Sequence, residues 1–236
     1  MQPFNSSTST DILVSGSLLL LDKPKGWTSF DAVNKIKNLV RRKYDLKKFK
    51  VGHSGTLDPM ATGLLVICTG TFTKKLEELI GKDKVYIAEI TLGIETNTYD
   101  AEGTTSEVKD VPALSTEELL VILQSFTGEL QQTPPAFSAI KKNGVPLYEL
   151  ARAGKEVTPE PRTVMVHEIK LLQYSENKIT LSVHSGKGFY VRSLAHDIGA
   201  RLGCGAHLSA LQRTSVGPYQ LTDAWTIADL EKKLKE

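Results

Sequence analysis

The chain has 236 residues, 40% of them hydrophobic and 24% charged, with a formal net charge of +2. This length suits one large domain or two small ones, and the composition is typical of a globular protein with its own hydrophobic core. The two cysteines lie far apart, and Cys68 sits in an apolar run, so a buried reduced thiol is expected rather than a disulfide or a metal ligand. No apolar stretch is long enough to span a membrane, and we expect a cytoplasmic protein.

The first half of the chain alternates short apolar runs with amphipathic segments. Residues 1–12 contain a serine- and threonine-rich stretch and are expected to form a flexible leader. A helix is predicted to begin at Thr28 or Ser29, because apolar residues follow at helical spacing. The other elements predicted here are strands at 16–22, 64–68 and 84–92 and a helix at 73–80.

The second half adds a hairpin and further helices. Ser115 and Glu118 form a capping-box pattern for a helix, and residues 175–177 can turn between strands at 163–174 and 178–184. Helices are also predicted at 191–202 and 226–235. The alternation of strands and helices predicts an α+β fold, with a mixed central sheet and packed helices.

Two segments are rich in basic residues. Eight lysines and arginines lie between Lys35 and Lys50 against one acid, Asp45, which suits either a solvated helix face or a phosphate-binding patch. Residues 131–162 are punctuated by proline and glycine and contain five basic residues. A long excursion of this kind from a compact domain is more often functional than accidental.

Several common site types have no matching motif in the sequence. There is no phosphate-loop motif, and Gly186-Lys187-Gly188 lacks the third glycine of a dinucleotide fingerprint. The five histidines show no metal-binding spacing, so no metal site is expected. The segment 52–56 narrowly misses the serine-hydrolase pattern G-x-S-x-G, because Thr56 replaces the last glycine.

The most informative stretch is Gly52-His-Ser-Gly-Thr-Leu-Asp-Pro-Met-Ala-Thr-Gly63. An aspartate before a proline is by itself a common turn signal. The whole stretch, however, resembles the catalytic motif G-H-x-G-x-L-D-P-x-A-T-G of the TruB family of pseudouridine synthases. Further matches in the family's order lie at 20–29, 84–86, 132–149, 187–199 and 205–213, so the resemblance covers roughly residues 16–217.

The resemblance implies a fold, a reaction and catalytic residues. It implies the pseudouridine synthase fold, with a mainly antiparallel sheet, in one catalytic domain over 13–236 with a thumb-like, RNA-gripping insertion at about 131–162. The family detaches uracil from C1′ of a uridine and reattaches it through C5, without a cofactor. Asp58 matches the catalytic carboxylate and Arg192 its ion-pair partner; whether Asp58 attacks C1′ or abstracts a proton on a glycal route stays open. Tyr86 matches a residue that stacks on the uracil and takes the C5 proton.

Other positions match residues that bind the substrate. Tyr190 and Leu211 match residues that line the uracil pocket. His53 matches a residue that contacts the flipped nucleotide, and Lys23 a basic residue near the active cleft. Without the resemblance, Tyr86 would be read as a core residue and Arg192 as a surface helix residue.

The resemblance also implies the substrate, the uridine at position 55 in the TΨC loop of transfer RNA. We expect a monomer that binds the T-arm of tRNA without a guide RNA, a metal or a membrane. Many family members carry a C-terminal RNA-binding PUA domain, and only about nineteen residues follow Gly217 here. A weaker and strongly salt-dependent affinity for tRNA is therefore expected.

Three alternatives stay open at this point. The related pseudouridine synthase of guide-RNA particles shares the G-H-S-G-T-L-D-P motif. A catalytically idle RNA-binding or RNA-folding module would keep the basic segments without the chemistry. A nucleoside hydrolase or glycosidase would usually need two acidic groups near one bond and would release a free base.

Overall fold

A computed structural model describes residues 2–235, which form two compact units. Unit 1 contains residues 2–86 and 212–235, and unit 2 contains residues 87–211. The chain crosses between the units within two strands, β4 (Lys84–Leu92) and β12 (Ala206–Val216). Each unit is described in turn below.

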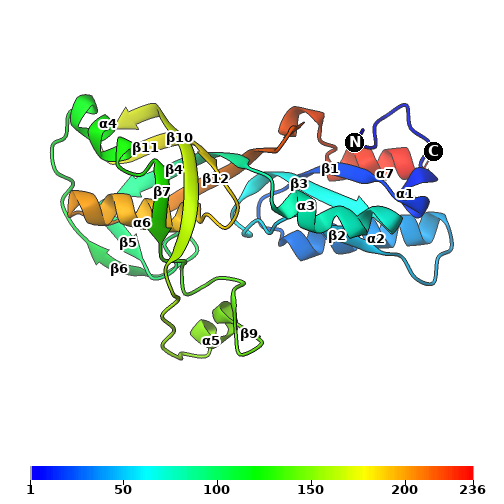
Figure 1. The fold of residues 1–236 in the computed structure, drawn as a ribbon, viewed down its shortest axis with the longest axis horizontal. Coiled ribbons are helices and arrows are strands. Elements are labelled where there is room, and N and C mark those ends of the chain that lie inside the picture. Colours follow the sequence, from blue (N-terminus) through cyan, green and yellow to red (C-terminus); the bar gives the residue numbers. More distant parts are fainter. Residues whose placement is uncertain (1, 236) are drawn as a thin grey trace. The chain divides into compact units, whose positions relative to one another are not determined.

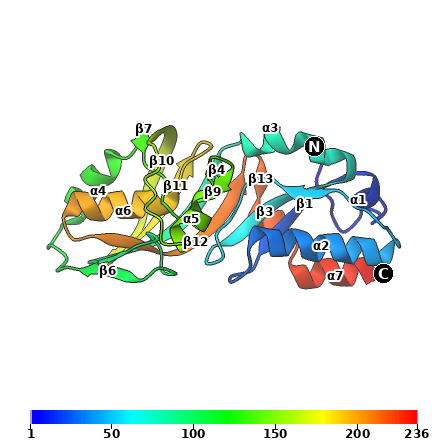
Figure 2. The same ribbon diagram turned by 90° about the horizontal axis from the view of Figure 1, so that it is seen from below.

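Unit 1 is built around two long neighbouring strands. Its elements are α1 (Ile12–Ser15), β1 (Leu18–Lys23), α2 (Ser29–Lys43), β2 (Val51–His53), β3 (Thr62–Thr69), the 3-10 helix η1 (Gly70–Lys75), α3 (Leu76–Ile80), β13 (Tyr219–Gln220), η2 (Leu221–Asp223) and α7 (Ile227–Lys235). β1 runs antiparallel to β3, from the pair Leu18–Cys68 to the pair Lys23–Gly63. The end of β12 pairs with β3 in parallel and with β13 in antiparallel orientation. Helices α2 and α7 lie side by side (Figures 1 and 2).

The apolar run of β1 is continuous because both faces of the strand are covered. Successive side chains of a strand point to opposite faces. Leu19 and Leu21 therefore join a core cluster with buried residues of α2 and α7, whereas Leu18 and Leu20 join a second cluster that includes Leu79 of α3. Phe4, within the segment expected to be a flexible leader, is buried in the first cluster.

Unit 2 contains an antiparallel sheet and three further helices. Its elements, besides β4 and β12, are β5 (Ile94–Thr96), β6 (Thr105–Val108), α4 (Thr116–Gln124), β7 (Gly128–Gln132), β8 (Lys141–Lys142), β9 (Val145–Pro146), α5 (Leu147–Arg152), β10 (Arg162–Ser175), β11 (Lys178–Ser185) and α6 (Val191–Leu202). The strand order here is β12-β4-β11-β10-β7, and β5 pairs separately with β6. Residues 133–161 leave the sheet between β7 and β10 and carry β8, β9 and α5 (Figure 1).

Helix α6 packs closely on the beginning of β12. A Cβ atom at Gly199 of α6 would lie 2.2 Å from the backbone nitrogen of Ala206, so only glycine permits this approach. The helix ends at Gly203, which adopts the left-handed conformation typical of a helix C-terminus. Leu194, Ala195 and Ile198 form the buried face of the helix.

The α+β prediction of a mixed, mainly antiparallel sheet is confirmed. The predicted helix start at Thr28 or Ser29, the capping box at Ser115 and the hairpin at 175–177 also form, and Thr28 makes a capping box with Asp31. The predicted helix at 73–80 differs, because the chain is a 3-10 helix to Lys75 and α-helical only over Leu76–Ile80. The single catalytic domain with a thumb-like insertion stays a prediction.

Candidate active site

Asp58 lies on the loop between β2 and β3, and several hydrogen bonds hold this loop to the start of α2. The Ser29 hydroxyl donates to the carbonyl oxygen of Leu57 and accepts from the Leu57 N–H, at 3.1 and 2.8 Å. The Gly26 N–H donates to the carbonyl oxygen of Pro59 at 2.8 Å, and the Asp58 carbonyl accepts from Ala61. Asp58 itself is half-buried, so its carboxylate is held on a well-anchored loop without being sealed in the core.

Lys23 is the last residue of β1 and contacts the same loop at Pro59. It is fully buried, and its ammonium donates to the carbonyl oxygens of Trp27 at 2.6 Å, Pro24 at 3.0 Å and Pro59 at 3.5 Å. A buried cation needs hydrogen-bond acceptors on all sides, and these carbonyls supply them. Lys23 therefore places a positive charge directly beside the residue that follows Asp58.

His53 ends β2, at the start of the loop. Burial lowers the pKa of His53 below its ordinary value, and the positive charge of Arg213 adds to this shift. The imidazole is accordingly neutral at pH 7. A neutral ring can contact a nucleobase without carrying a charge into the contact.

Tyr86 lies on β4 at the end of unit 1 and is only 8% exposed. Its hydroxyl lies close to the guanidinium of Arg213 on β12 and interacts with it electrostatically. Two residues before it, Lys84 is also buried, and burial together with the charge of Arg213 lowers the pKa of Lys84 to about 8. In unit 1, Lys23 thus contacts the Asp58 loop at Pro59, and Arg213 lies near both His53 and Tyr86.

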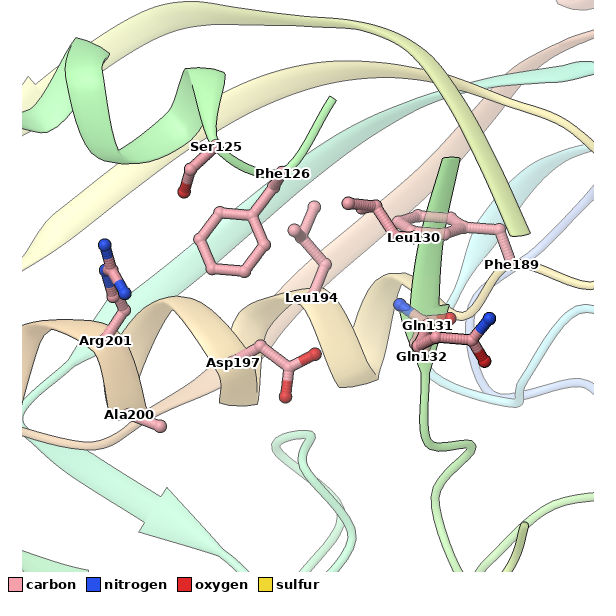
Figure 3. A pocket seen from close by; sticks show the side chains of 10 residues that line it. All are labelled: Ser125, Phe126, Leu130, Gln131, Gln132, Phe189, Leu194, Asp197, Ala200 and Arg201. Atoms are coloured by element: carbon pink, nitrogen blue, oxygen red, sulfur yellow. The ribbon is translucent and has the colours of Figure 1, made fainter. Parts of the chain in front are cut away.

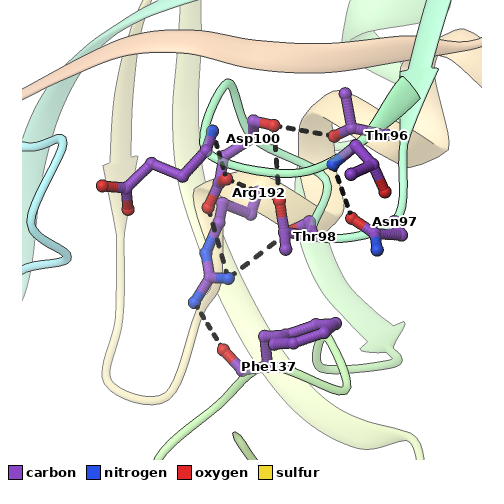
Figure 4. A network of polar contacts seen from close by, with 8 residues as sticks. Thr96, Asn97, Thr98, Asp100, Phe137 and Arg192 are labelled. Carbon is purple, nitrogen blue, oxygen red and sulfur yellow. Dashed lines mark hydrogen bonds and ion pairs between the residues drawn. The ribbon is translucent and has the colours of Figure 1, made fainter. Parts of the chain in front are cut away.

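Arg192 lies in the first turn of α6 in unit 2 and forms a buried ion pair with Asp100. The guanidinium nitrogen Nη1 is 3.4 Å from the Asp100 carboxylate, and the two side chains are 6% and 4% exposed. Arg192 also donates to the carbonyl oxygens of Thr98 and Phe137, at 3.3 and 3.1 Å (Figure 4). The carboxylate of Asp100 accepts from the Thr98 hydroxyl at 2.6 Å and from the Glu102 N–H at 3.0 Å. Thr98 and Asp100, in the segment after β5, and Phe137, in the insertion, therefore hold the Arg192 side chain in place.

Tyr190 precedes α6, and its backbone is clamped by Gln132 at the end of β7. The Gln132 amide accepts from the Tyr190 N–H at 2.8 Å and donates to the Tyr190 carbonyl at 3.0 Å. The neighbouring Ser193 hydroxyl donates to the carbonyl oxygen of Thr133 at 2.7 Å. Leu211, the last residue of unit 2 on β12, is 8% exposed.

A cavity of about 430 Å³ lies in unit 2 between α4, β7 and α6. Apolar side chains of Phe126, Leu130, Phe189 and Leu194 form part of its wall, and Asp197 and Arg201 of α6 also border it (Figure 3). Gln132 and Phe189 belong to this wall and adjoin Tyr190 in space or in sequence. The backbone that presents Tyr190 thus borders a cavity rather than a filled core.

Each predicted site residue therefore has a defined place. Lys23, His53, Asp58 and Tyr86 belong to unit 1, and Tyr190, Arg192 and Leu211 belong to unit 2. The expected ion pair between Asp58 and Arg192 joins residues of different units and stays a prediction. Asp100 was missed, because nothing in its sequence context marks it. Ser29 and Gln132 lie inside the matched motifs at 20–29 and 132–149, so the motifs could have marked them as candidate site residues.

Among the described residues, no helix is both long enough and apolar enough to cross a membrane.

Comparison with known proteins defines the class to which this site belongs. The family model for the TruB family pseudouridylate synthase (N-terminal domain) matches residues 41–191, and the model for the tRNA pseudouridylate synthase B C-terminal domain matches residues 192–236. The class is that of the pseudouridine synthases. The chain belongs to the TruB family within it.

Individual relatives agree with this assignment. The protein named tRNA pseudouridine synthase B of Flavobacterium johnsoniae is 46% identical over 225 residues, which cover 94% of this chain and 97% of that protein. The protein of the same name from Dechloromonas aromatica is 48% identical, over 91% of this chain and 69% of that protein. In a solved Cbf5-Nop10-Gar1 complex, one chain superposes with a TM-score of 0.69 at 28% identity, covering 93% of this chain and 54% of that chain.

Proposed function

We propose that this protein converts uridine 55 in the T-arm of tRNA to pseudouridine, with Asp58 as the catalytic carboxylate. The relatives named above carry the tRNA activity in their names. The observation that carries the assignment to Asp58 is its place on the anchored Gly52–Gly63 loop, within the matched family motif.

The reaction balances without any added reagent. The bond between N1 and C1′ breaks, a bond between C5 and C1′ forms, C5 loses a proton and N1 gains one. Asp58 acts at the sugar or abstracts a proton there, and either step requires its ionised form. Tyr86 stacks on the uracil and accepts the C5 proton.

Residues of unit 2 complete the proposed set. Arg192 offers a cation to the negative charge of Asp58, and a nearby opposite charge favours an ionised carboxylate. Tyr190 and Leu211 line the space for the uracil. His53 contacts the flipped nucleotide. Lys23 lies near the active cleft, where its buried ammonium supplies positive charge beside the Asp58 loop. The enzyme works as a monomer on tRNA alone.

Extrusion of the target base costs a few kcal/mol, which contacts to the RNA backbone must offset. The end of α2 and the chain after it offer such contacts, because Arg42, Lys43, Lys47, Lys48 and Lys50 are exposed. The insertion adds exposed Lys141, Lys142 and Lys155. Contacts of this kind to phosphates fix the register of the RNA without reading its sequence.

The test is pseudouridine formation on an unmodified tRNA transcript by the wild type, Asp58→Ala and Asp58→Asn. The modified position is mapped by carbodiimide-dependent primer extension. Both variants should lose the signal at position 55, whereas Asp223→Ala, which removes an exposed acid of the same unit, should retain it. Equal signals from the wild type and Asp58→Ala would refute the proposed role of Asp58.

A guide-RNA-type synthase is the second candidate, favoured by the similarity to the chain in the Cbf5-Nop10-Gar1 complex. The same assay separates the two functions. A reaction on the bare transcript, with no other RNA or protein added, supports the standalone tRNA enzyme. A wild-type protein that is inactive there but active with a guide RNA supports the second candidate.

A further inference from the structure

Arg213 on β12 is among the largest fully buried side chains of unit 1, with 1% exposure. Its Nε donates to the carbonyl oxygen of Leu64 at 2.7 Å, and its Nη2 donates to the carbonyl oxygen of Gly55 at 3.2 Å. The same guanidinium lies close to the Tyr86 hydroxyl and interacts with it electrostatically. These three groups belong to the loop before Asp58, to the strand after it and to β4.

Burial of a guanidinium among carbonyl groups is costly, and an apolar side chain would fill the position at a lower cost. Burial lowers the pKa of Arg213, and the Tyr86 hydroxyl opposes this shift. The guanidinium nevertheless stays protonated, as arginine does in proteins. The stability of the core therefore does not explain why a cationic side chain occupies position 213.

The backbone of β12 adds a second constraint on the same loop. Arg213 pairs with Gly63, where the loop enters β3, and a Cβ atom at Gly63 would lie 2.4 Å from the Arg213 carbonyl oxygen. Gly63 has φ +99°, a conformation that other residues rarely adopt. The loop is thus tied to Arg213 by backbone packing at one end and by the guanidinium at Gly55.

We propose that Arg213 is a positioning residue, whose guanidinium holds the Asp58 loop and the Tyr86 hydroxyl in one fixed arrangement for catalysis. The proposal rests on the roles of Asp58 and Tyr86 in the proposed function. A planar guanidinium has five donors in a rigid fork, so it can bind three acceptors in different directions at once. It also faces the Tyr86 oxygen with positive charge, which stabilises a negatively charged oxygen, the form that can accept the C5 proton.

Lys84 provides a matched control in the same unit. It is a second buried cation, and its ammonium donates to the carbonyl oxygens of Ile80 and Lys82, at 2.7 and 2.5 Å. These acceptors lie in the turn before β4 and outside the Gly52–Gly63 loop. Replacement of Lys84 by methionine removes a buried cation without removing a hydrogen bond to that loop.

The experiment compares Arg213→Met, Arg213→Lys and Lys84→Met with the wild type in the full-length protein. For each protein, the rate of pseudouridine formation is measured in a single turnover at saturating tRNA, together with the Kd for tRNA and the Tm. Displacement of reacting groups by about 1 Å can lower a rate on the order of 10²-fold. We expect Arg213→Met to lose at least this factor in rate with a Kd within threefold of the wild type. Arg213→Lys should recover part of the rate, and Lys84→Met should stay within threefold of the wild-type rate.

Hydrogen exchange gives a second measurement that does not depend on activity. In Arg213→Lys, amides of residues 52–63 should exchange faster than in the wild type, whereas those of β1 should be unchanged. If Arg213→Met fails to fold, this measurement still tests whether Arg213 holds the Asp58 loop in place. Unchanged exchange of the loop, or a rate for folded Arg213→Met equal to that of Lys84→Met, would overturn the proposal. If the wild type itself forms no pseudouridine, or Asp58→Ala is fully active, the proposed function fails instead, while the exchange result still tests the tie to the loop.

Discussion

The ion pair between Arg192 and Asp100 is almost wholly withdrawn from water. Removal of one partner from such a pair leaves a buried charge without its counter-charge and typically costs several kcal/mol. We expect Asp100→Ala to lower the free energy of unfolding by roughly 3 kcal/mol. Asp100→Asn should lose less, because the amide can still accept a hydrogen bond. Both should also lower the rate of pseudouridine formation, since Arg192 loses a group that orients it.

Urea unfolding of the two variants and the wild type measures this difference. Glu102→Gln changes an exposed acid in the same turn and serves as the control. An Asp100→Ala protein as stable as Glu102→Gln would show that the ion pair contributes little.

Cys68 illustrates a different consequence of burial. Burial raises the pKa of the Cys68 thiol to about 11, and both cysteines are free and buried. The thiolate is the reactive form, and at pH 8 it makes up about one part in 10³ of a thiol with this pKa. We expect the folded protein to resist alkylation by iodoacetamide at pH 8, and both cysteines to be labelled after unfolding in guanidinium. Mass spectrometry of the two samples measures this, and rapid labelling of Cys68 in the folded protein would contradict it.

Secondary-structure elements were predictable from the sequence where the determining interactions are local. The helix start at Thr28 and the capping box at Ser115 depend on residues three positions apart, and both form as predicted. The hairpin formed by β5 and β6 and the long strand β12 were not predicted, because their pairing depends on partners far along the chain. The same limit applies to the candidate site. The loop at 52–63 was identified from its motif, whereas the bonds from Arg213 to Gly55 and Leu64 span 158 and 149 residues and leave no local pattern.

His196 joins α6 to the segment that follows β5. Its Nδ1 lies 3.2 Å from the Asp197 carboxylate and its Nε2 3.4 Å from that of Glu95, and its ring stacks on Tyr99 at 4.0 Å between centroids. Tyr99 directly precedes Asp100, the partner of Arg192. The hydrogen bond to Asp197 is the largest cause that raises the pKa of His196; burial opposes it, and the charge of Glu95 adds to the rise.

The raised pKa of His196 gives a pH dependence of defined sign. A group whose pKa is higher in the folded state stabilises the fold fully below its unfolded value, about 6.5 for histidine. This contribution is lost as the pH rises through the folded-state pKa. We expect the stability of the wild type, relative to His196→Gln, to fall as the pH rises from 5.5 to 8.5. Urea unfolding across this range measures the difference, and parallel curves for the two proteins would exclude a linkage through His196.

At the scale of the whole molecule, the proposed reaction draws on both units. Asp58, Tyr86 and Arg213 belong to unit 1, whereas Tyr190, Arg192 and Asp100 belong to unit 2. In unit 1 the loop is fixed to α2, β3 and β12, and in unit 2 the start of α6 is fixed to β7 and to the turn after β5. Each unit therefore holds its own reactive groups by hydrogen bonds and ion pairs within that unit. In the proposed reaction, the tRNA binds to the reactive groups of both units.

Binding of that substrate depends on charges spread over the surface, and the structure divides the basic run at 35–50 into two groups. Lys35 forms an ion pair with Glu231, and Arg41 donates to the carbonyl oxygen of Leu46, so both have structural partners. Arg42 and Lys43 lie in the last turn of α2, where positive charge also stabilises the helix dipole. Lys47 and Lys48 follow the helix and are exposed. They are therefore the best test of a contact with RNA phosphates.

We expect Lys47→Gln/Lys48→Gln to weaken tRNA binding and to reduce its dependence on salt. Each phosphate contact contributes about 0.7 to 0.9 to the slope of log K against log salt concentration, so loss of two contacts should lower the slope by roughly 1.5. Filter binding from 50 to 300 mM KCl measures the slope for the wild type, the double variant and the control Lys170→Gln/Lys178→Gln, which removes two exposed lysines of unit 2. The rate at saturating tRNA should stay at the wild-type value, because the bonds that anchor the Asp58 loop come from Ser29, Gly26 and Arg213 and not from these lysines. A slope equal to that of the wild type would assign Lys47 and Lys48 to the solvated surface and would leave the insertion as the main source of phosphate contacts.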